Sequence, residues 1–336
     1  MISRSDGRHE DATDLLDGTD RKLLNEIQWE FPLDEKPFAA IGRKVGTDES
    51  DAISRVSKLK ASGIIRQINA IYDTRRLGYS STLVSFAVGD GDVDAVAERI
   101  NMHPGVSHNY RRDSEFNLWF TLATPPGTDV TAEAARLAEE NGIRRWHLLP
   151  ALKLYKIGVR LNMTGEEMKQ QKDRRQWETP FSAGEDDKRF IRATQKDIRI
   201  IERPFNPVAD ELGMSVKELF GKFDHYQRLG VMRRFAAILR HQKAGFVANG
   251  MVCWKADEQD SARIADVTSK INEVSHCYMR PTYEDWPYST FTMIHGRERK
   301  ECEKIAEEIS RQTGIADYVI LYSTKEYKKQ RVEYFV

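Results

Sequence analysis

The chain of 336 residues is 40% hydrophobic and 31% charged, and its 52 basic and 52 acidic side chains give a formal net charge of zero. That length allows two to four domains with cores of their own, the balanced charge does not favour DNA as a partner, and no apolar run approaches the roughly 20 residues of a membrane span. The polar N-terminus does not resemble a secretory signal and the three cysteines form no Cys-x-x-Cys pair, which predicts a reducing cytoplasmic location without a zinc site or disulfides.

Two successive kinds of periodicity divide the first half of the chain. Leu23, Leu24 and Ile27 recur at helical spacing, and two short helices and a β-branched strand follow, which is the outline of a winged helix-turn-helix. The pattern then becomes strand, helix, strand, strand, helix, strand, the order of a ferredoxin-like βαββαβ domain. The first half therefore predicts one two-part module.

The second half repeats this plan. Ile198, Ile200 and Ile201 are predicted to lie on its first helix, and a charged segment short of aliphatic residues predicts an exposed linker between the halves. The fold class is α+β, with two tandem modules. The predicted boundaries are a disordered tail at 1–14, winged helix-turn-helix domains at 15–77 and 191–244, ferredoxin-like domains at 78–161 and 245–336, and a linker at 162–190.

One strand motif occurs in both ferredoxin-like domains. It reads Val-Ser-His-Asn-Tyr-Arg-Arg at 106–112 and Val-Ser-His-Cys-Tyr-Met-Arg at 274–280. A single histidine on a strand is usually structural, but a repeated trio could supply a general acid or base, a hydrogen-bond donor and a carboxylate clamp, and the histidine could equally ligate a metal or haem iron. Because side chains alternate along a strand, each trio shares one face: His108, Tyr110 and Arg112 in the first copy, and His276, Tyr278 and Arg280 in the second.

Aromatic residues follow the second motif. Tyr283, Trp286 and Tyr288 lie among two prolines, His295 ends the next strand, and the first copy has Trp119 on the corresponding strand. Aromatic walls suit a flat conjugated ligand, although a packed sheet surface would use the same side chains. The sequence leaves both interpretations open.

Basic residues are concentrated in the wings rather than in the predicted recognition helices. The helix at 48–62 has as many acidic as basic side chains and the helix at 215–229 has an excess of one, so a packing scaffold is favoured over sequence-specific DNA binding. The second wing carries Arg233, Arg234 and His241 without an acidic residue. It suits either a solvated edge or a site for a carboxylate-rich ligand.

At these residues the chain resembles a known family. The plan is similar to that of the Lrp/AsnC regulators, and the motifs at 274–281, 286–288 and 293–296 resemble those of siroheme decarboxylases, which occur as two paired subunits or as one fused chain. The segment 233–237 with His241 resembles the wing of one partner, and the segments 106–110 and 117–121 resemble the other partner. In the first copy Ser114 and Phe116 stand where the family pattern has His and Tyr, so the resemblance points to the second copy as the catalytic half.

The resemblance implies an activity and its participants. Such enzymes remove carbon dioxide from two acetate groups of siroheme and give didecarboxysiroheme, either for an alternative route to heme or for heme d1. No added cofactor is implied, because the iron and the macrocycle enter with the substrate. The implied partners are siroheme and the other copy in an internal pseudo-dimer, with a homodimer also open. The alternatives are a heme- or metabolite-sensing transcription regulator and a non-catalytic heme carrier.

The resemblance also implies roles for individual residues. The implied catalytic residues are His276, His295, Tyr278 and Arg280, with one of the two histidines as the proton donor. The implied substrate-binding residues are Arg233, Arg234, His241, Tyr283, Trp286, Tyr288, His108, Tyr110, Arg112 and Trp119. No resident metal is expected, and His241 or His276 would approach the substrate iron.

Overall fold

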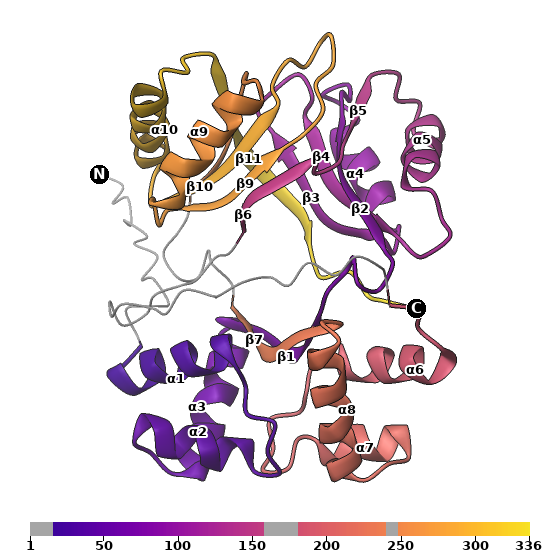
Figure 1. The fold of residues 1–336 in the computed structure, drawn as a ribbon, viewed down its shortest axis with the longest axis vertical. Helices are drawn as coiled ribbons and strands as arrows, with labels where there is room; N and C mark the ends of the chain where they lie inside the picture. Colours follow the sequence, from indigo (N-terminus) through magenta and orange to yellow (C-terminus); the bar gives the residue numbers. More distant parts are fainter. Residues whose placement is uncertain (1–15, 158–180, 240–247) are drawn as a thin grey trace, which may run out of the picture. The chain divides into compact units, whose positions relative to one another are not determined.

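The computed structural model describes residues 16–157, 181–239 and 248–336, which form two compact units (Figure 1). The first unit contains the helix-turn-helix segments of both copies, and the second contains both ferredoxin-like segments. The predicted two tandem modules are therefore confirmed, but each kind of segment packs with its own kind. No helix in the described ranges is both long and apolar enough to cross a membrane.

The first unit consists of two helical trios and a two-stranded sheet. Glycine holds the turn between the second and third helix of each trio, because Gly46 and Gly213 adopt the left-handed region with φ of 85° and 68°. Each copy contributes only one strand, and the two strands pair antiparallel, so each wing is completed by the other copy. The elements are α1 (Gly18–Trp29), α2 (Pro37–Val45), α3 (Glu49–Ala61), β1 (Ile65–Tyr72), α6 (Glu185–Thr194), α7 (Asn206–Leu212), α8 (Val216–Arg228) and β7 (Met232–Leu239).

Aromatic side chains from both copies form a shared core in this unit. Phe31 lies 5.5 Å from Phe38 of its own copy, and 6.3 Å and 6.0 Å from Phe205 and Phe235 of the other copy, measured between ring centroids. All four rings are fully buried or nearly so. Burial of this apolar area stabilises the two helix-turn-helix segments as a pair.

The first helix of the second copy lies earlier than predicted. Helix α6 spans Glu185–Thr194, whereas Ile198 and Ile201 follow it in a non-helical segment, so their assignment to this helix was wrong. The backbone N–H of Ile198 instead donates to the carbonyl of Ile68 on β1 at 2.9 Å. The helix begins inside the segment 162–190, which was predicted to be a linker. The prediction was wrong here because the charged residues on the exposed face of α6 give it the composition of a linker.

The second unit is one nine-stranded sheet with four helices. Its strands run in the order β5-β2-β4-β3-β11-β8-β10-β9-β6, so strand β11 of the second copy pairs with β3 of the first, and β6 of the first copy pairs with β9 of the second. Each copy thus has the predicted βαββαβ order, and its C-terminal strand segment (β6, or the second part of β11) extends the sheet of the other copy. The elements are β2 (Ser80–Phe86), α4 (Val93–Asn101), β3 (Val106–Arg112), β4 (Leu118–Thr124), α5 (Val130–Glu140), β5 (Trp146–Leu149), β6 (Lys153–Ile157), β8 (Ala248–Trp254), α9 (Glu258–Ser269), β9 (Val274–Met279), β10 (Thr290–Gly296), α10 (Arg299–Thr313) and β11 (Tyr318–Lys329).

The two halves of this sheet face each other, with the helices on the outside. Trp119 of β4 and Phe291 of β10 belong to one buried cluster, although their strands are far apart in the strand order. Helices α4 and α5 pack on the other face of the first half, and α9 and α10 pack on that of the second (Figure 1). The two sheet halves thus form a sandwich. On its inner face, between the halves, the residues of each histidine motif can contact residues of the other copy.

Lysines on β6 and β11 also cap the C-terminal ends of helices in the opposite copy. Lys156 on β6 donates from Nζ to the carbonyls of Thr268 and Ile271 at 2.8 and 2.7 Å, at the C-terminal end of α9. Its counterpart on β11, Lys328, donates to the carbonyl of Asn101, the last residue of α4, at 2.7 Å. Burial lowers the pKa of both ammonium groups. These bonds give the carbonyls at the end of each helix a charged donor and place a cation at the negative end of the helix.

We expect replacement of Lys156 by methionine to lower the free energy of unfolding by about 1–3 kcal/mol, because partly buried carbonyls lose a charged donor. Replacement of Lys270, an exposed residue at the C-cap of α9, should change it by less than about 0.5 kcal/mol. Urea denaturation of the two variants measures the difference. Equal stability of the two would show that the capping bonds contribute nothing.

Candidate active site

A chain of hydrogen bonds joins the two predicted histidines of the second copy. The hydroxyl of Ser275 lies 2.6 Å from Nδ1 of His276 and 2.7 Å from Nε2 of His295. Nδ1 of His295 lies 2.5 Å from Oδ1 of Asn249, its register partner on β8. A bulge in the pairing of β9 with β10 lets the adjacent residues Ser275 and His276 both reach this group. We call these four residues the Ser275 relay.

The partners of the relay fix the direction of its hydrogens. A carbonyl oxygen only accepts, so Nδ1 of His295 carries the hydrogen in its bond to Asn249. In neutral His295, Nε2 then accepts from the hydroxyl of Ser275, which itself accepts from Nδ1 of His276. When His295 takes up a proton on Nε2, both bonds reverse, and His276 changes tautomer by exchange with solvent, so that its hydrogen moves from Nδ1 to Nε2. The relay can thus carry one proton from His295 to the Nε2 atom of His276.

The first copy lacks half of this relay. Nδ1 of His108 lies 3.0 Å from the hydroxyl of Ser107, as in the second copy. Since His108 pairs with Thr121 and His276 pairs with Met293, the position that corresponds to His295 is two residues beyond Thr121. The sequence has Ala123 there, and Ala123 pairs with Ser81 where His295 pairs with Asn249. The first copy therefore has an imidazole and a hydroxyl but no second imidazole.

The tyrosine and arginine of each motif lie beside their histidine, as the strand period predicts. In the second copy the rings of His276 and Tyr278 stack with centroids 5.9 Å apart, and the guanidinium of Arg280 lies 4.9 Å from the centre of the Tyr278 ring. Nη1 of Arg280 donates to the carbonyl of Leu149, at the end of β5 in the first copy. Burial lowers the pKa of Arg280 to about 10, which leaves it charged at neutral pH.

Arg112 repeats this arrangement from the first copy to the second. Its Nη1 donates to the carbonyl of Leu321 on β11 of the second copy at 2.9 Å, and burial lowers its pKa. The Nε atoms of both Arg112 and Arg280 are buried without a hydrogen-bond partner among the described residues. The two arginines therefore cross between the copies as a symmetric pair and bring two cations into the inner face of the sandwich.

The predicted aromatic residues divide into core and surface. Trp119 and Trp286 are 1% and 6% exposed and lie 5.4 Å apart in the cluster between the sheet halves, which favours the packing interpretation that the sequence left open. Tyr288 packs on Trp286 and lines a pocket of about 530 Å³, whereas Tyr283 is 36% exposed. Phe116, the family departure in the first copy, is buried beside Trp286.

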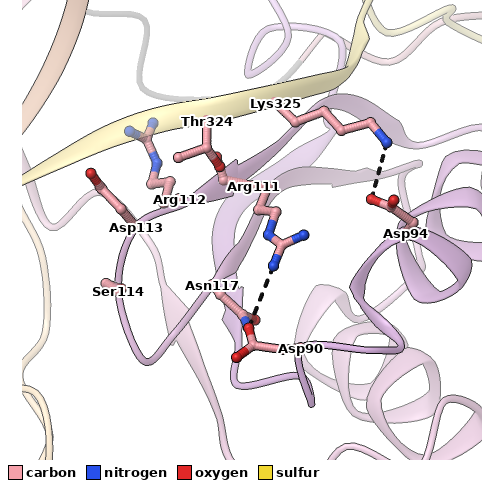
Figure 2. Close-up of a pocket in the computed structure, with 9 residues that line it drawn as sticks. All are labelled: Asp90, Asp94, Arg111, Arg112, Asp113, Ser114, Asn117, Thr324 and Lys325. Atoms are coloured by element: carbon pink, nitrogen blue, oxygen red, sulfur yellow. Dashed lines mark hydrogen bonds and ion pairs between the residues drawn. The ribbon is translucent and has the colours of Figure 1, made fainter.

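A second pocket, of about 470 Å³, lies at the end of β3 (Figure 2). Arg111 pairs with Asp90 and Lys325 pairs with Asp94 across it. Of the predicted site residues it includes only Arg112, and the residues of the Ser275 relay do not line either pocket. Within the described ranges no three His, Cys, Asp or Glu side chains are arranged to hold a metal ion.

His147 is a buried histidine that the sequence did not single out. Its Nε2 lies 2.7 Å from Oδ1 of Asp285, and its ring stacks on Tyr283 with centroids 4.4 Å apart. Burial raises the pKa of the Asp285 carboxyl, but hydrogen bonds from Arg145 and His147 outweigh it, so the net shift is downward. The strand pattern of 146–149 contained no signal for this pair, because its partner lies far along the chain in the other copy.

The predicted wing residues lie in the other unit. Arg233 pairs with Asp73 of the first copy at 2.6 Å, so the wing that lacks acidic residues in its own sequence receives one from its partner strand. The guanidinium of Arg234 lies 5.9 Å from the ring of Trp29. His241 lies outside the described residues. The structure therefore describes Arg233 and Arg234 within the first unit, by their contacts there.

Two cations of the first predicted recognition helix, α3, are paired with carboxylates of the same unit. Arg55 on α3 bonds to Asp17, Asp20 and Asp51 at 2.6, 2.9 and 2.6 Å. Lys60 on the same helix pairs with Asp197 of the second copy. Cations that are held by carboxylates contribute little to phosphate binding, which agrees with the interpretation of α3 as a packing scaffold.

Comparison with known proteins agrees with this arrangement in both units. A family model described as the AsnC-like ligand binding domain matches residues 76–156 and 243–328, and one described as the siroheme decarboxylase NirDL-like HTH domain matches residues 20–66 and 187–233. The siroheme decarboxylase of Hydrogenobacter thermophilus is 39% identical over 94% of this chain and 94% of its own. A crystal structure of the siroheme decarboxylase NirDL in complex with an iron-uroporphyrin III analogue is 34% identical, covers 95% of both chains and superposes with a TM-score of 0.75.

A shorter relative matches part of the chain. The siroheme decarboxylase beta subunit of Methanosarcina barkeri is 39% identical over 44% of this chain and 96% of its own length. A fused chain whose two halves exchange strands agrees with a relative built as separate subunits. The near full-length identity, together with both family models, shows that this chain belongs to the siroheme decarboxylase family.

Proposed function

We propose that the chain is a carboxy-lyase that decarboxylates siroheme at two acetate side chains and releases didecarboxysiroheme. The near full-length relative with 39% identity is a siroheme decarboxylase, which supports this substrate. Each step converts –CH₂–COO⁻ and one proton into –CH₃ and CO₂, so it consumes a proton and needs no oxidant. The iron and the conjugated macrocycle enter with the substrate, and we propose no further cofactor.

The Ser275 relay is the observation that carries the mechanism. After loss of CO₂, the electron pair left on the acetate carbon must take up a proton. His276 gives it from Nε2, the hydroxyl of Ser275 returns one to Nδ1 of His276, and His295 replaces the proton of Ser275. The relay ends neutral and takes one proton from solvent before the second step. Asn249 holds His295 in the orientation that makes this direction favourable.

Substrate binding requires cations, because siroheme carries eight carboxylates. Arg280 and Arg112 are charged and close to the tyrosines of their motifs, so they suit carboxylates of a ligand on the inner face. We propose that Tyr278 and Tyr110 donate hydrogen bonds beside them, and that Tyr283 and Tyr288 border the macrocycle. Arg233, Arg234 and His241 are the proposed contribution of the first unit. Because the relay uses both ring nitrogens of His276, we propose that His241 approaches the substrate iron.

The asymmetry between the copies supports the second copy as the catalytic one. Ala123 cannot supply the proton that His295 supplies, so the first copy would bind and orient substrate with His108 rather than reprotonate it. A sensing regulator would need a DNA-binding surface, and the paired cations of Arg55 and Lys60 do not favour it. We propose the internal pseudo-dimer as the functional unit, with a homodimer of the whole chain as a further possibility.

Anaerobic incubation of the purified chain with siroheme, followed by mass spectrometry of the tetrapyrrole, tests the proposed function. Loss of two carbon dioxide units is the expected result. Siroheme that binds but keeps its mass would contradict the enzyme and indicate a sensor or carrier instead. A mass loss that is unchanged in a variant lacking both His276 and His295 would contradict the relay but not the activity.

A further inference from the structure

The connection after the motif strand differs between the two copies. In the first copy, the N–H of Arg112 bonds to the carbonyl of Asn117, which closes a short turn between β3 and β4. In the second copy, the N–H of Arg280 bonds to the carbonyl of Ser289 and closes a longer loop between β9 and β10. We call residues 281–288 the motif loop. It begins directly after Arg280, and it carries Tyr283 and Tyr288.

Three consecutive residues of β5 in the first copy hold the motif loop and its base. His147 bonds through Nε2 to Asp285 at 2.7 Å. The backbone of Leu148 both donates to and accepts from the hydroxyl of Tyr283, at 3.2 and 2.6 Å. The carbonyl of Leu149 accepts from Arg280. Strand β5 is therefore the surface on which the loop of the catalytic copy is docked.

His147 is the only side chain of these three that bonds to the loop, since Leu148 and Leu149 use their backbone. It is 3% exposed, and its ring lies between Tyr283 and Phe116, with centroids 4.4 and 4.1 Å away. Its Nδ1 lies 3.3 Å from the hydroxyl of Ser85 on β2. The imidazole is thus held from three sides with its Nε2 directed at Asp285.

The order Ser85, His147, Asp285 superficially matches a nucleophile, base and acid. Ser85 is completely buried, so no substrate reaches its hydroxyl, and the bond to Nδ1 is long for an activated nucleophile. Asp285 is shared with Arg145, which also pairs with Glu115. The group therefore holds structure in place and does not carry out chemistry itself.

We infer that His147, from the non-catalytic copy, is a positioning residue for the site of the catalytic copy. This rests on the proposed function. By fixing Asp285 it fixes the motif loop, and through the loop it fixes Arg280 and Tyr283 relative to the strand that carries His276 and Tyr278. Loss of the Nε2–Asp285 bond removes one of the contacts that hold the loop and weakens siroheme binding, while the Ser275 relay, which His147 does not touch, keeps its geometry.

The test compares substitutions that distinguish the hydrogen bond to Asp285 from the packing of the His147 ring. His147→Phe keeps the aromatic ring between Tyr283 and Phe116 but removes the donor. His147→Gln places an amide donor near the position of Nε2 and should restore much of the function. Asp285→Asn removes the charge of the acceptor. If His147→Phe folds poorly, the other two variants still report on the same bond.

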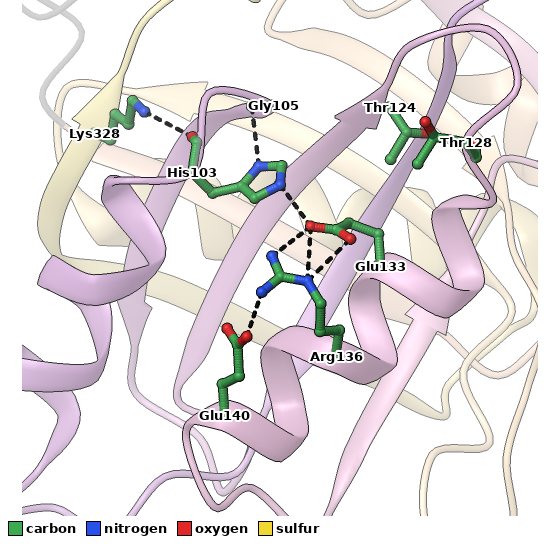
Figure 3. Close-up of polar contacts among 8 residues, drawn as sticks. All are labelled: His103, Gly105, Thr124, Thr128, Glu133, Arg136, Glu140 and Lys328. Carbon is green, nitrogen blue, oxygen red and sulfur yellow. Dashed lines mark hydrogen bonds and ion pairs between the residues drawn. The ribbon is translucent and has the colours of Figure 1, made fainter.

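The matched control is another histidine–carboxylate pair in the first copy. Nε2 of His103 lies 2.8 Å from Oε1 of Glu133, and its Nδ1 accepts from the N–H of Gly105 at 3.0 Å (Figure 3). Glu133 also pairs with Arg136, as Asp285 pairs with Arg145. His103 contacts neither the motif loop nor the Ser275 relay. His103→Phe therefore measures how much the loss of a histidine–carboxylate pair lowers the stability of the protein, without an effect on the site.

Steady-state kinetics and an absorbance titration with siroheme give the readout. We expect His147→Phe and Asp285→Asn to raise KM and the siroheme Kd roughly tenfold, with kcat within about threefold, and His147→Gln to recover most of the loss. His103→Phe should leave KM and Kd unchanged. If His147→Phe also changes only the melting temperature, the positioning role is wrong. If the wild type binds siroheme without decarboxylating it, the proposed function fails, but the Kd values still decide this inference.

Discussion

Replacement of His276 by alanine should lower kcat for siroheme decarboxylation by about 10²–10⁴-fold, the usual contribution of a general acid. In the proposed mechanism His276 is the last group of the Ser275 relay and gives the proton to the acetate carbon. Siroheme binding, measured by absorbance titration, should change far less than kcat, because Arg280 and the motif loop remain. Single-turnover rates from product mass give the loss for each of the two carboxylates.

The matched replacement in the first copy is His108→Ala. His108 has the same serine neighbour as His276, but Ala123 stands where the relay needs a second imidazole. We expect this variant to raise KM and to leave kcat within about threefold for both carboxylates. If instead each alanine variant stopped after the loss of one carbon dioxide, each copy would serve one acetate and the proposed asymmetry would be wrong.

This asymmetry arises within a nearly symmetric scaffold. The arginines of the two motifs cross to strands β5 and β11 of the opposite copies, and Lys156 and Lys328 cap helices of the opposite copies. Each ferredoxin-like half has four strands of its own and receives one further strand from the other copy. Because strand β6 of the first copy extends the sheet of the second and Leu149 of the first copy binds Arg280, the first copy has a structural role even without a relay of its own.

The sequence predicted what depends on local pattern. The two-part plan, the βαββαβ order and the neighbouring positions of His276, Tyr278 and Arg280 follow from helix and strand periods, which a single segment contains. The pairing of the motif arginines with carbonyls across the sandwich did not follow, because Arg280 meets Leu149 only through the packing of two sheet halves.

The remaining errors also have a physical cause. Helix α6 was missed because its exposed face is highly charged and its buried face is narrow, which resembles a linker in composition. The sheet formed by β1 and β7 was missed because the sequence of one strand does not indicate which other strand it pairs with. His147 was missed for the same reason: its role depends on Asp285, which comes beside it only in the folded protein. The importance of Ala123 becomes clear only from the strand pairing, which shows that it occupies the position in the first copy that His295 occupies in the second.

A double-mutant cycle should show that Ser275 and His295 act as one unit. Each of Ser275→Ala and His295→Ala removes the supply of protons to Nδ1 of His276, so each should lower kcat by about 10²-fold or more. If protons travel through both groups in series, the double variant should lose little beyond the larger single effect, because groups that act together are strongly non-additive.

Ser107→Ala is the control for this cycle, since Ser107 makes the same bond to His108 in a copy without the second imidazole. Its kcat should stay within about threefold of the wild type. Independent roles of Ser275 and His295 would instead give multiplicative losses in the double variant, and would mean that His295 acts on substrate directly. A loss in Ser107→Ala as large as that in Ser275→Ala would mean that the hydroxyl serves to orient the adjacent imidazole. The comparison therefore separates proton supply, which only the second copy can provide, from the alignment of a strand histidine, which both copies share.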